Sequence, residues 1–206
     1  MGDRIFRGVV AVLVRILYNP KVFFEGEPLK GKKLKEPSII VSNHTSHLDG
    51  PVLNTALRRE KIHTLAAKDR FDQRGFGFFL RHTGCIPIDR QHADTSWIHE
   101  ALKVMKVDGE SVAIYPEGRH GSYRHQLPFH SGVSMLAVMA QMPIVMVYQD
   151  GPHRIFRRSK MIIGEPFRIE MPEGGLSAEF VEAKTAMLQE KMKALMDEYI
   201  RIDETQ

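Results

Sequence analysis

The chain has 206 residues, which is enough for one domain with a sizeable core, and its 43% hydrophobic and 26% charged residues are typical of an ordinary folded protein. It has one cysteine, Cys85, which by itself can form neither an internal disulfide framework nor a zinc site, so a reducing compartment fits best. The formal net charge of +4 is a mild excess that suits anionic lipid, phosphorylated substrates or an acidic carrier without selecting among them.

The N-terminus carries no recognisable targeting signal. Its apolar run over residues 8–14 is short and is followed by Arg15 instead of a small-residue cleavage site, so no cleavable signal peptide is expected. Myristoylation at Gly2 is not expected either, because Phe6 stands where the modification needs Ser or Thr.

Residues 4–18 are predicted to form an amphipathic helix. At 100° per residue, Arg4, Arg7 and Arg15 fall within one arc of about 80°, and aliphatic side chains cover the opposite side. Such a helix is typical of segments that lie in a membrane interface, so we expect residues 1–20 to associate with a membrane. The alternative is that the aliphatic side packs on the domain core.

The rest of the chain alternates predicted strands and helices without an internal repeat. An uncharged stretch at 131–149 is divided by Pro143 and interrupted by Gln141, so it predicts a buried helix followed by a buried strand, not a membrane span. The pattern predicts an α/β fold over 1–206, with a central mixed sheet flanked by helices. Strands are expected near 38–41, 62–68, 85–88, 111–115 and 144–148, with further strands in 160–171 broken at 164–166, and helices at 51–57, 75–84, 95–106, 132–141 and 177–200.

The sequence Asn-His-Thr-Ser-His-Leu-Asp at 43–49 follows a buried strand, at an edge where α/β proteins commonly place their sites. On one continuous helix His44 and Asp49 would lie about 140° apart, so they can meet only if His44 lies in the turn and Asp49 begins the helix. A carboxylate beside an imidazole fixes its tautomer and strengthens it as a base, which suits removal of a proton from an alcohol. The alternative is that both are turn and cap residues.

Two further motifs follow buried strands. In Gly-Cys-Ile-Pro-Ile-Asp-Arg at 84–90, the guanidinium of Arg90 can hold a phosphate through two hydrogen bonds, although a surface ion pair with Asp89 is the alternative. In Tyr-Pro-Glu-Gly-Arg-His-Gly-Ser at 115–122, proline and Gly118 force a sharp turn that holds Glu117 at the sheet edge. Arg119 and a histidine crowd this turn, so the choice lies between an anion-binding loop and an ordinary turn.

Taken together, these residues resemble the glycerolphosphate and lysophosphatidic acid acyltransferases over about residues 37–168. The likeness rests on four blocks in order: Asn43, His44 and Asp49; Gly84, Ile86, Ile88 and Arg90; Tyr115, Pro116, Glu117 and Gly118; and Pro143, Ile144 and Val147. Lys68 also matches the family. One departure is that the family usually continues its Glu-Gly pair with Thr-Arg-Ser, whereas Arg119-His120-Gly121-Ser122 stands here.

The resemblance implies an enzyme that moves a fatty acyl group from acyl-CoA or acyl carrier protein to the free hydroxyl of 1-acylglycerol-3-phosphate, giving phosphatidic acid. It implies His44 as the general base, Asp49 as the group that orients it, and Arg90 as the phosphate ligand. Substrate contacts are also expected at Lys68, Glu117, Gly118 and Arg119.

The resemblance further implies no cofactor, no metal and no nucleic-acid partner. It places the protein at the cytoplasmic face of the membrane as a peripheral or monotopic protein. Four alternatives remain open: another lysolipid or aminolipid acceptor, an acyl-carrying nucleophile at Cys85, a metal hydrolase using His44, His47 and Asp49, and a non-catalytic lipid-binding protein.

Overall fold

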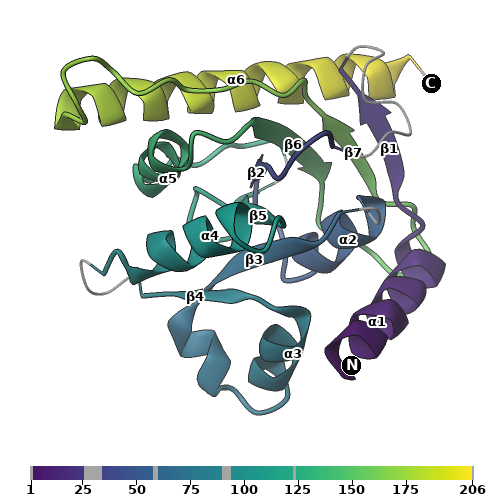
Figure 1. Cartoon of the computed structure of the whole chain (residues 1–206). Helices are drawn as coiled ribbons and strands as arrows, with labels where there is room; N and C mark the ends of the chain where they lie inside the picture. The colour runs from purple at the N-terminus through teal and green to yellow at the C-terminus, as the bar shows by residue number, and fades with distance from the viewer. Residues whose placement is uncertain (1, 26–33, 58–59, 90–93, 123, 206) are drawn as a thin grey trace.

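The computed structural model describes residues 2–25, 34–57, 60–89, 94–122 and 124–205 (Figure 1). Within these residues a seven-stranded sheet has the order β1-β7-β6-β2-β5-β3-β4. Neighbouring strands are parallel except β6 and β7, which are antiparallel, so the prediction of a mixed sheet is confirmed. The strands are β1 (Lys21–Phe24), β2 (Ile39–Ser42), β3 (Ile62–Ala67), β4 (Ile86–Ile88), β5 (Ser111–Ile114), β6 (Ile144–Asp150) and β7 (Lys160–Ile163).

Helices cover both faces of this sheet. One core packs the sheet against α4, α5 and α6, and a second packs it against α1 and α2. The central strand β2 serves both, because Ile39 and Val41 point into the first core and Ile40 into the second. The helices are α1 (Gly2–Tyr18), α2 (Asp49–Ala56), α3 (Phe76–Thr83), α4 (Ser96–Lys106), α5 (Gly132–Ala140) and α6 (Ala178–Glu204), with a 3-10 turn η1 (Lys68–Asp72).

Most predicted elements are confirmed, and two differences have physical causes. The sequence analysis gave no strand at residues 21–24, yet β1 forms there as an edge strand that pairs with β7. The expected strand after residue 166 is wrong: Phe167 makes only an isolated bridge to Ile144. Pro166 has no N–H to donate, so the ladder cannot continue through it.

The uncharged stretch at 131–149 folds as the buried helix α5 followed by the buried strand β6, as the sequence predicts. Across the described residues, none of the helices combines the length and the apolar content that crossing a bilayer requires.

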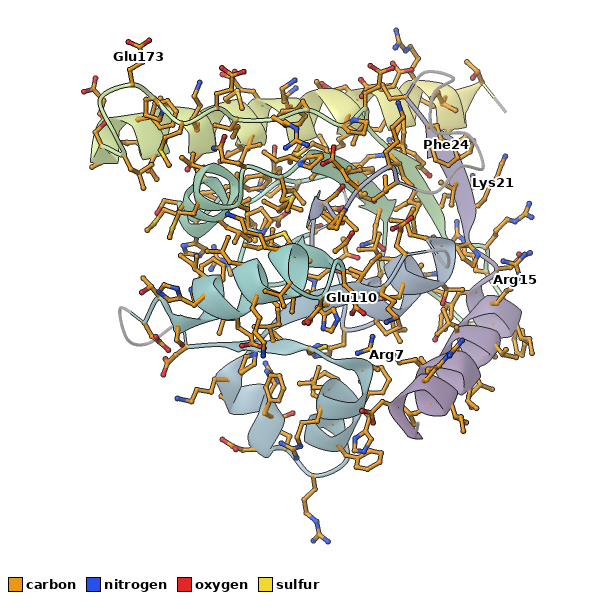
Figure 2. The ribbon with its side chains drawn as sticks, in the orientation of Figure 1. Arg7, Arg15, Lys21, Phe24, Glu110 and Glu173 are labelled. Atoms are coloured by element: carbon orange, nitrogen blue, oxygen red, sulfur yellow. The ribbon has the colours of Figure 1, made fainter. Side chains whose placement is uncertain are left out.

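Helix α1 packs on α2 through one side only. Val14 and Tyr18 are buried against the domain, and Figure 2 shows Arg7 directed from α1 toward the domain. The alternative in which the aliphatic side packs on the core is wrong. That side faces outward, with exposed fractions of 53–65% for Ile5, Val9, Val12, Leu13 and Ile16.

Candidate active site

His44 and Asp49 meet because the chain turns between them. His44 lies in the turn that follows β2, and Asp49 is the first residue of α2. Nδ1 of His44 is 2.8 Å from Oδ2 of Asp49. Since Nδ1 is engaged with the carboxylate, Nε2 is the ring nitrogen left to accept a proton from another molecule.

The carboxylate of Asp49 is fully buried, and hydrogen bonds from the protein take the place of water around it. Oδ2 accepts hydrogen bonds from the backbone N–H groups of Thr45 (2.5 Å) and Ser46 (3.0 Å), and Oδ1 accepts from their hydroxyls at 3.0 and 2.9 Å. Burial favours the protonated acid, but the imidazoles of His153 and His44 and the backbone donor of Ser46 outweigh it, so the pKa of Asp49 lies well below its usual value. Asp49 therefore remains ionised beside His44.

His153 is a second imidazole on this carboxylate, and the sequence analysis missed it. Its side chain is fully buried, and Nε2 lies 3.2 Å from Oδ1 of Asp49. His153 follows β6, whose end is fastened to the motif turn by two hydrogen bonds between Asn43 and the backbone of Gln149, at 2.7 and 3.0 Å. No spacing rule connects residue 153 with residue 49, so only the register of β2 beside β6 reveals the contact.

Aromatic rings pack around His44. The ring of Tyr115 is stacked on it with centroids 4.4 Å apart, and His120 meets its edge at 4.2 Å. Burial keeps the pKa of Tyr115 well above its usual value, so this ring stays neutral. Burial, together with the neighbouring His44 and His47, lowers the pKa of His120 to about 4, so a neutral imidazole stands beside His44 at neutral pH.

The turn after β5 is tied to the His44 loop by a backbone hydrogen bond of 2.6 Å, from Gly121 N–H to the carbonyl of His44. Gly118 has φ +65°, and a Cβ there would approach the ring of His130 to 2.9 Å, so a larger residue is both strained and crowded. Glu117 is buried in the same turn, and burial raises its pKa to about 7 against the opposing effect of hydrogen bonds from Leu127 and His44.

A large cleft of about 1410 Å³ reaches this site. Helix α1 forms part of its wall through Arg4, Arg7 and Val10, while His44, Gly118 and Arg119 line it near the motif turns. The exposed fraction of the His44 side chain is 21%, so its ring is accessible from the cleft. Much of the remaining lining is apolar, including Leu65, Ile88, Trp97, Ile98, Val133 and Met135. The cleft can therefore hold a long apolar chain beside a polar reacting group.

The model of the family described as Acyltransferase matches residues 21–149. The chain belongs to the acyltransferase family. It is 30% identical over 162 residues to a 1-acyl-sn-glycerol-3-phosphate acyltransferase of Bacillus subtilis, an alignment that covers 76% of this chain and 80% of that protein.

Other acyltransferases are longer than this chain. It is 28% identical to a 1-acyl-sn-glycerol-3-phosphate acyltransferase of Streptococcus pneumoniae over 73% of this chain and 56% of that one. It is 32% identical to the beta form from Homo sapiens over 74% of this chain and 58% of that one. The crystal structure of the 1-acyl-sn-glycerophosphate acyltransferase PlsC from Thermotoga maritima has the same fold, with a TM-score of 0.59, 22% identity, and coverage of 94% of this chain and 84% of that one.

The predicted substrate residues of this acyltransferase have different locations. Gly118 and Arg119 line the cleft. Glu117 instead lines a small neighbouring pocket together with His44. Lys68 forms an ion pair with Asp89 at 3.6 Å. Arg90 lies outside the described residues. The sequence analysis missed Arg70, which lines the cleft from η1 and lowers the pKa of His47 together with burial. The only indication of Arg70 in the sequence was that a basic residue follows shortly after a predicted strand.

The alternative with an acyl-carrying nucleophile at Cys85 loses support. Burial raises the pKa of the Cys85 thiol, whereas a nucleophilic cysteine needs its thiolate stabilised. Among the described residues, no group of three or more His, Cys, Asp or Glu side chains is arranged to hold a metal ion.

Glu117→Gln should change how stability depends on pH. The pKa of Glu117 rises from 4.5 to about 7 on folding, so its protonated form favours the folded state below pH 4.5, and this contribution is lost as the pH rises through 7. The variant should therefore gain stability relative to the parent across that range, by on the order of 3 kcal/mol. Urea unfolding at a series of pH values measures this, and parallel pH profiles for the two proteins would show that Glu117 is not a buried acid.

Proposed function

We propose that this acyltransferase moves a fatty acyl group from a thioester to the free hydroxyl of 1-acylglycerol-3-phosphate, giving phosphatidic acid for phospholipid biosynthesis. The observation that carries the proposal is that His44, on the wall of a large, mainly apolar cleft, is hydrogen-bonded to the buried Asp49. The names of the relatives from Bacillus subtilis, Streptococcus pneumoniae and Homo sapiens support the same acceptor.

In the proposed mechanism His44 is the general base. Nε2 takes the proton of the acceptor hydroxyl while the oxygen attacks the thioester carbonyl and forms a tetrahedral oxyanion. Asp49 holds Nδ1–H and stabilises the imidazolium that results, and His153 holds the other carboxylate oxygen of Asp49 in place. Collapse of the intermediate breaks the carbon–sulfur bond, and the proton on His44 passes to the departing thiolate. The new ester and a free thiol are the products.

The proposed phosphate site is the basic part of the cleft. Arg119 and Arg70 line it near His44, and guanidinium groups suit phosphate because they can donate two parallel hydrogen bonds. Arg90 is proposed as a further phosphate ligand on the strength of its motif. Gly118 shapes the cleft wall next to Arg119, and Glu117 lines a neighbouring small pocket and supports this turn.

The acyl chains are proposed to lie along the apolar lining between α4, α5, the strand β3 and the edge strand β4. The donor is acyl-CoA or acyl carrier protein, and the mechanism uses only protein side chains, with no cofactor or metal.

We propose that the protein works as a peripheral protein on the cytoplasmic face of the membrane, with α1 in the interface. The five exposed aliphatic side chains of α1 lie opposite the side that packs on the domain, and Arg4 and Arg15 of the same helix are also exposed. Burial of apolar area and attraction of arginine to anionic lipid both favour this placement.

His44→Ala should fold normally and lose acyl transfer on the order of 10²–10⁴-fold, because the loss of a general base raises the barrier without opening the core. Asp49→Asn should also lose most activity, through a misplaced imidazole. The assay follows phosphatidic acid formation from 1-acylglycerol-3-phosphate and acyl-CoA in detergent. His99→Ala, an exposed histidine of α4, is the control and should retain activity. A folded His44→Ala enzyme with near-normal turnover would rule out the proposed base.

Arg119→Ala and Arg90→Ala should each raise the KM for the phosphorylated acceptor and leave the KM for the thioester nearly unchanged, since the contact is lost at one substrate only. Loss of a charge-assisted contact of about 1.5–3 kcal/mol corresponds to roughly a tenfold to hundredfold rise. Arg201→Ala on α6 is the control, because it removes an arginine outside the cleft and should leave both KM values unchanged. Equal increases in the KM values for the acceptor and the thioester would show that these arginines do not bind the phosphate of the acceptor.

Replacing Val9, Val12 and Ile16 together by serine should weaken binding to anionic vesicles without lowering the melting temperature, because these side chains are exposed in the folded protein. Deleting α1 is a poorer test, because it would uncover the core around Val14 and Tyr18. Vesicle flotation measures binding, with the exposed pair Met171→Ser and Leu176→Ser as the control. Unchanged flotation of the α1 variant would contradict the interfacial role of α1.

A further inference from the structure

The segment that joins β6 to β7 carries an exposed apolar and basic tip. Its sequence from residue 151 is Gly-Pro-His-Arg-Ile-Phe-Arg-Arg-Ser. Phe156 is 83% exposed and Ile155 is 59% exposed. Within the part of the chain that the structure describes, eleven large apolar side chains are exposed; five lie on the outward side of α1 and two at this tip. The outward side of α1 thus carries the largest group of them, and the tip carries the most exposed one, Phe156.

These two segments are joined directly. The N–H of Phe156 donates to the carbonyl of Leu17 at 2.7 Å, and the N–H of Ser159 donates to the carbonyl of Tyr18 at 2.8 Å. The loop therefore satisfies two of the carbonyls that the last turn of α1 leaves free. The ring of His153 also meets the ring of Tyr18 edge-on, with centroids 6.5 Å apart. The tip is consequently fixed at the C-terminal end of α1 and continues its exposed apolar surface.

The charge of the tip matches one kind of partner. Arg154, Arg157 and Arg158 are exposed, and none of them forms an ion pair within the described residues. Residues 151–160 contain no acidic side chain. An aromatic side chain between unpaired arginines suits a surface that is apolar at depth and negative at its boundary, which describes an anionic phospholipid bilayer.

We propose that residues 154–158 are a second membrane-contacting element, in which Ile155 and Phe156 enter an anionic bilayer beside α1 and the three arginines contact lipid phosphates. This inference extends the interfacial placement of α1 that forms part of the proposed function. Two attachments fix the orientation of the domain on the bilayer better than one helix, which can roll about its own axis.

The same segment also places the site next to the bilayer. A Cβ on Gly151 would lie 1.8 Å from Oγ1 of Thr45, so the beginning of the loop packs against the turn that carries His44. His153, beside the carboxylate of Asp49, is only two residues before Ile155. Insertion of the tip therefore sets the position of the membrane relative to the His44 turn.

The test uses the full chain and vesicles of phosphatidylcholine with and without phosphatidylglycerol. Phe156→Trp should show a blue-shifted emission on vesicles and quenching by brominated lipid, whereas Val107→Trp, at a site that is 75% exposed outside both segments, should show neither. The native Trp97 is buried and is common to both proteins. Ile155→Ser with Phe156→Ser should weaken vesicle affinity on the order of 10–100-fold, and Val107→Ser should not.

Arg157→Gln with Arg158→Gln should weaken binding by roughly tenfold or more on the anionic vesicles only. Tryptophan emission at position 156 that is indifferent to vesicles would overturn the proposal. So would a double serine variant that binds vesicles like the parent. If the parent also proved to be a dimer that this variant fails to form, the tip would instead be a contact between two copies. Acyl transfer to a short-chain acceptor in detergent is measured in parallel. Insertion without any transfer activity would refute only the proposed function, and activity without insertion would refute only this inference.

Discussion

The ionised carboxylate of Asp49 is the group on which the arrangement of the site depends. A buried charge is costly unless hydrogen bonds and opposite charges replace the water it has lost. Four donors from Thr45 and Ser46 and the imidazoles of His44 and His153 provide this replacement. They come from the turn after β2 and from the segment after β6, while Asp49 itself begins α2, so the carboxylate keeps its charge only while these three elements are docked. The geometry that orients His44 is therefore a property of the folded sheet, not of the motif alone.

The same docking connects the chemistry to the surface. β2 and β6 are neighbours in the sheet (Figure 1). The segment leaving β6 passes Asp49 at His153 before it reaches the end of α1. Helix α1 buries one side against α2 and leaves its aliphatic side outward, while its Arg4 and Arg7 line the cleft. A lipid substrate needs a protein that binds the bilayer and a cleft that opens close to it. In this structure α1 contributes to both the proposed membrane-binding surface and the wall of the cleft.

Much of the fold could be predicted because its signals are local. β2, β5 and β6 are continuous apolar runs, and α6 repeats apolar residues such as Leu188, Met192 and Leu195 at helical spacing. Helix geometry showed that His44 and Asp49 could meet only if His44 lay in the turn and Asp49 began the helix, and the structure has this arrangement. β1 could not be predicted in this way, because four residues on a sheet edge carry no clear period and depend on β7 for their pairing.

The undetected parts of the site depend on tertiary structure. His153 reaches Asp49 through the pairing of β2 with β6, and Arg70 reaches the cleft through the packing of η1. The sequence showed that α1 has a basic and an aliphatic side but could not show which one faces the domain, because both choices bury some side chains. The packing of Tyr18 and Val14 on α2 settles that choice.

In the proposed function, the acyl group of the thioester is transferred intact to the hydroxyl of a lysophospholipid. The most direct measurement incubates the purified full chain with acyl-CoA and 1-acylglycerol-3-phosphate in detergent, and counts free thiol and phosphatidic acid in the same sample. Free thiol and phosphatidic acid should appear in equal amounts, and release of the thiol should depend on the acceptor. Thiol release that is matched by free fatty acid, or that proceeds at the same rate without the acceptor, would contradict the proposed function.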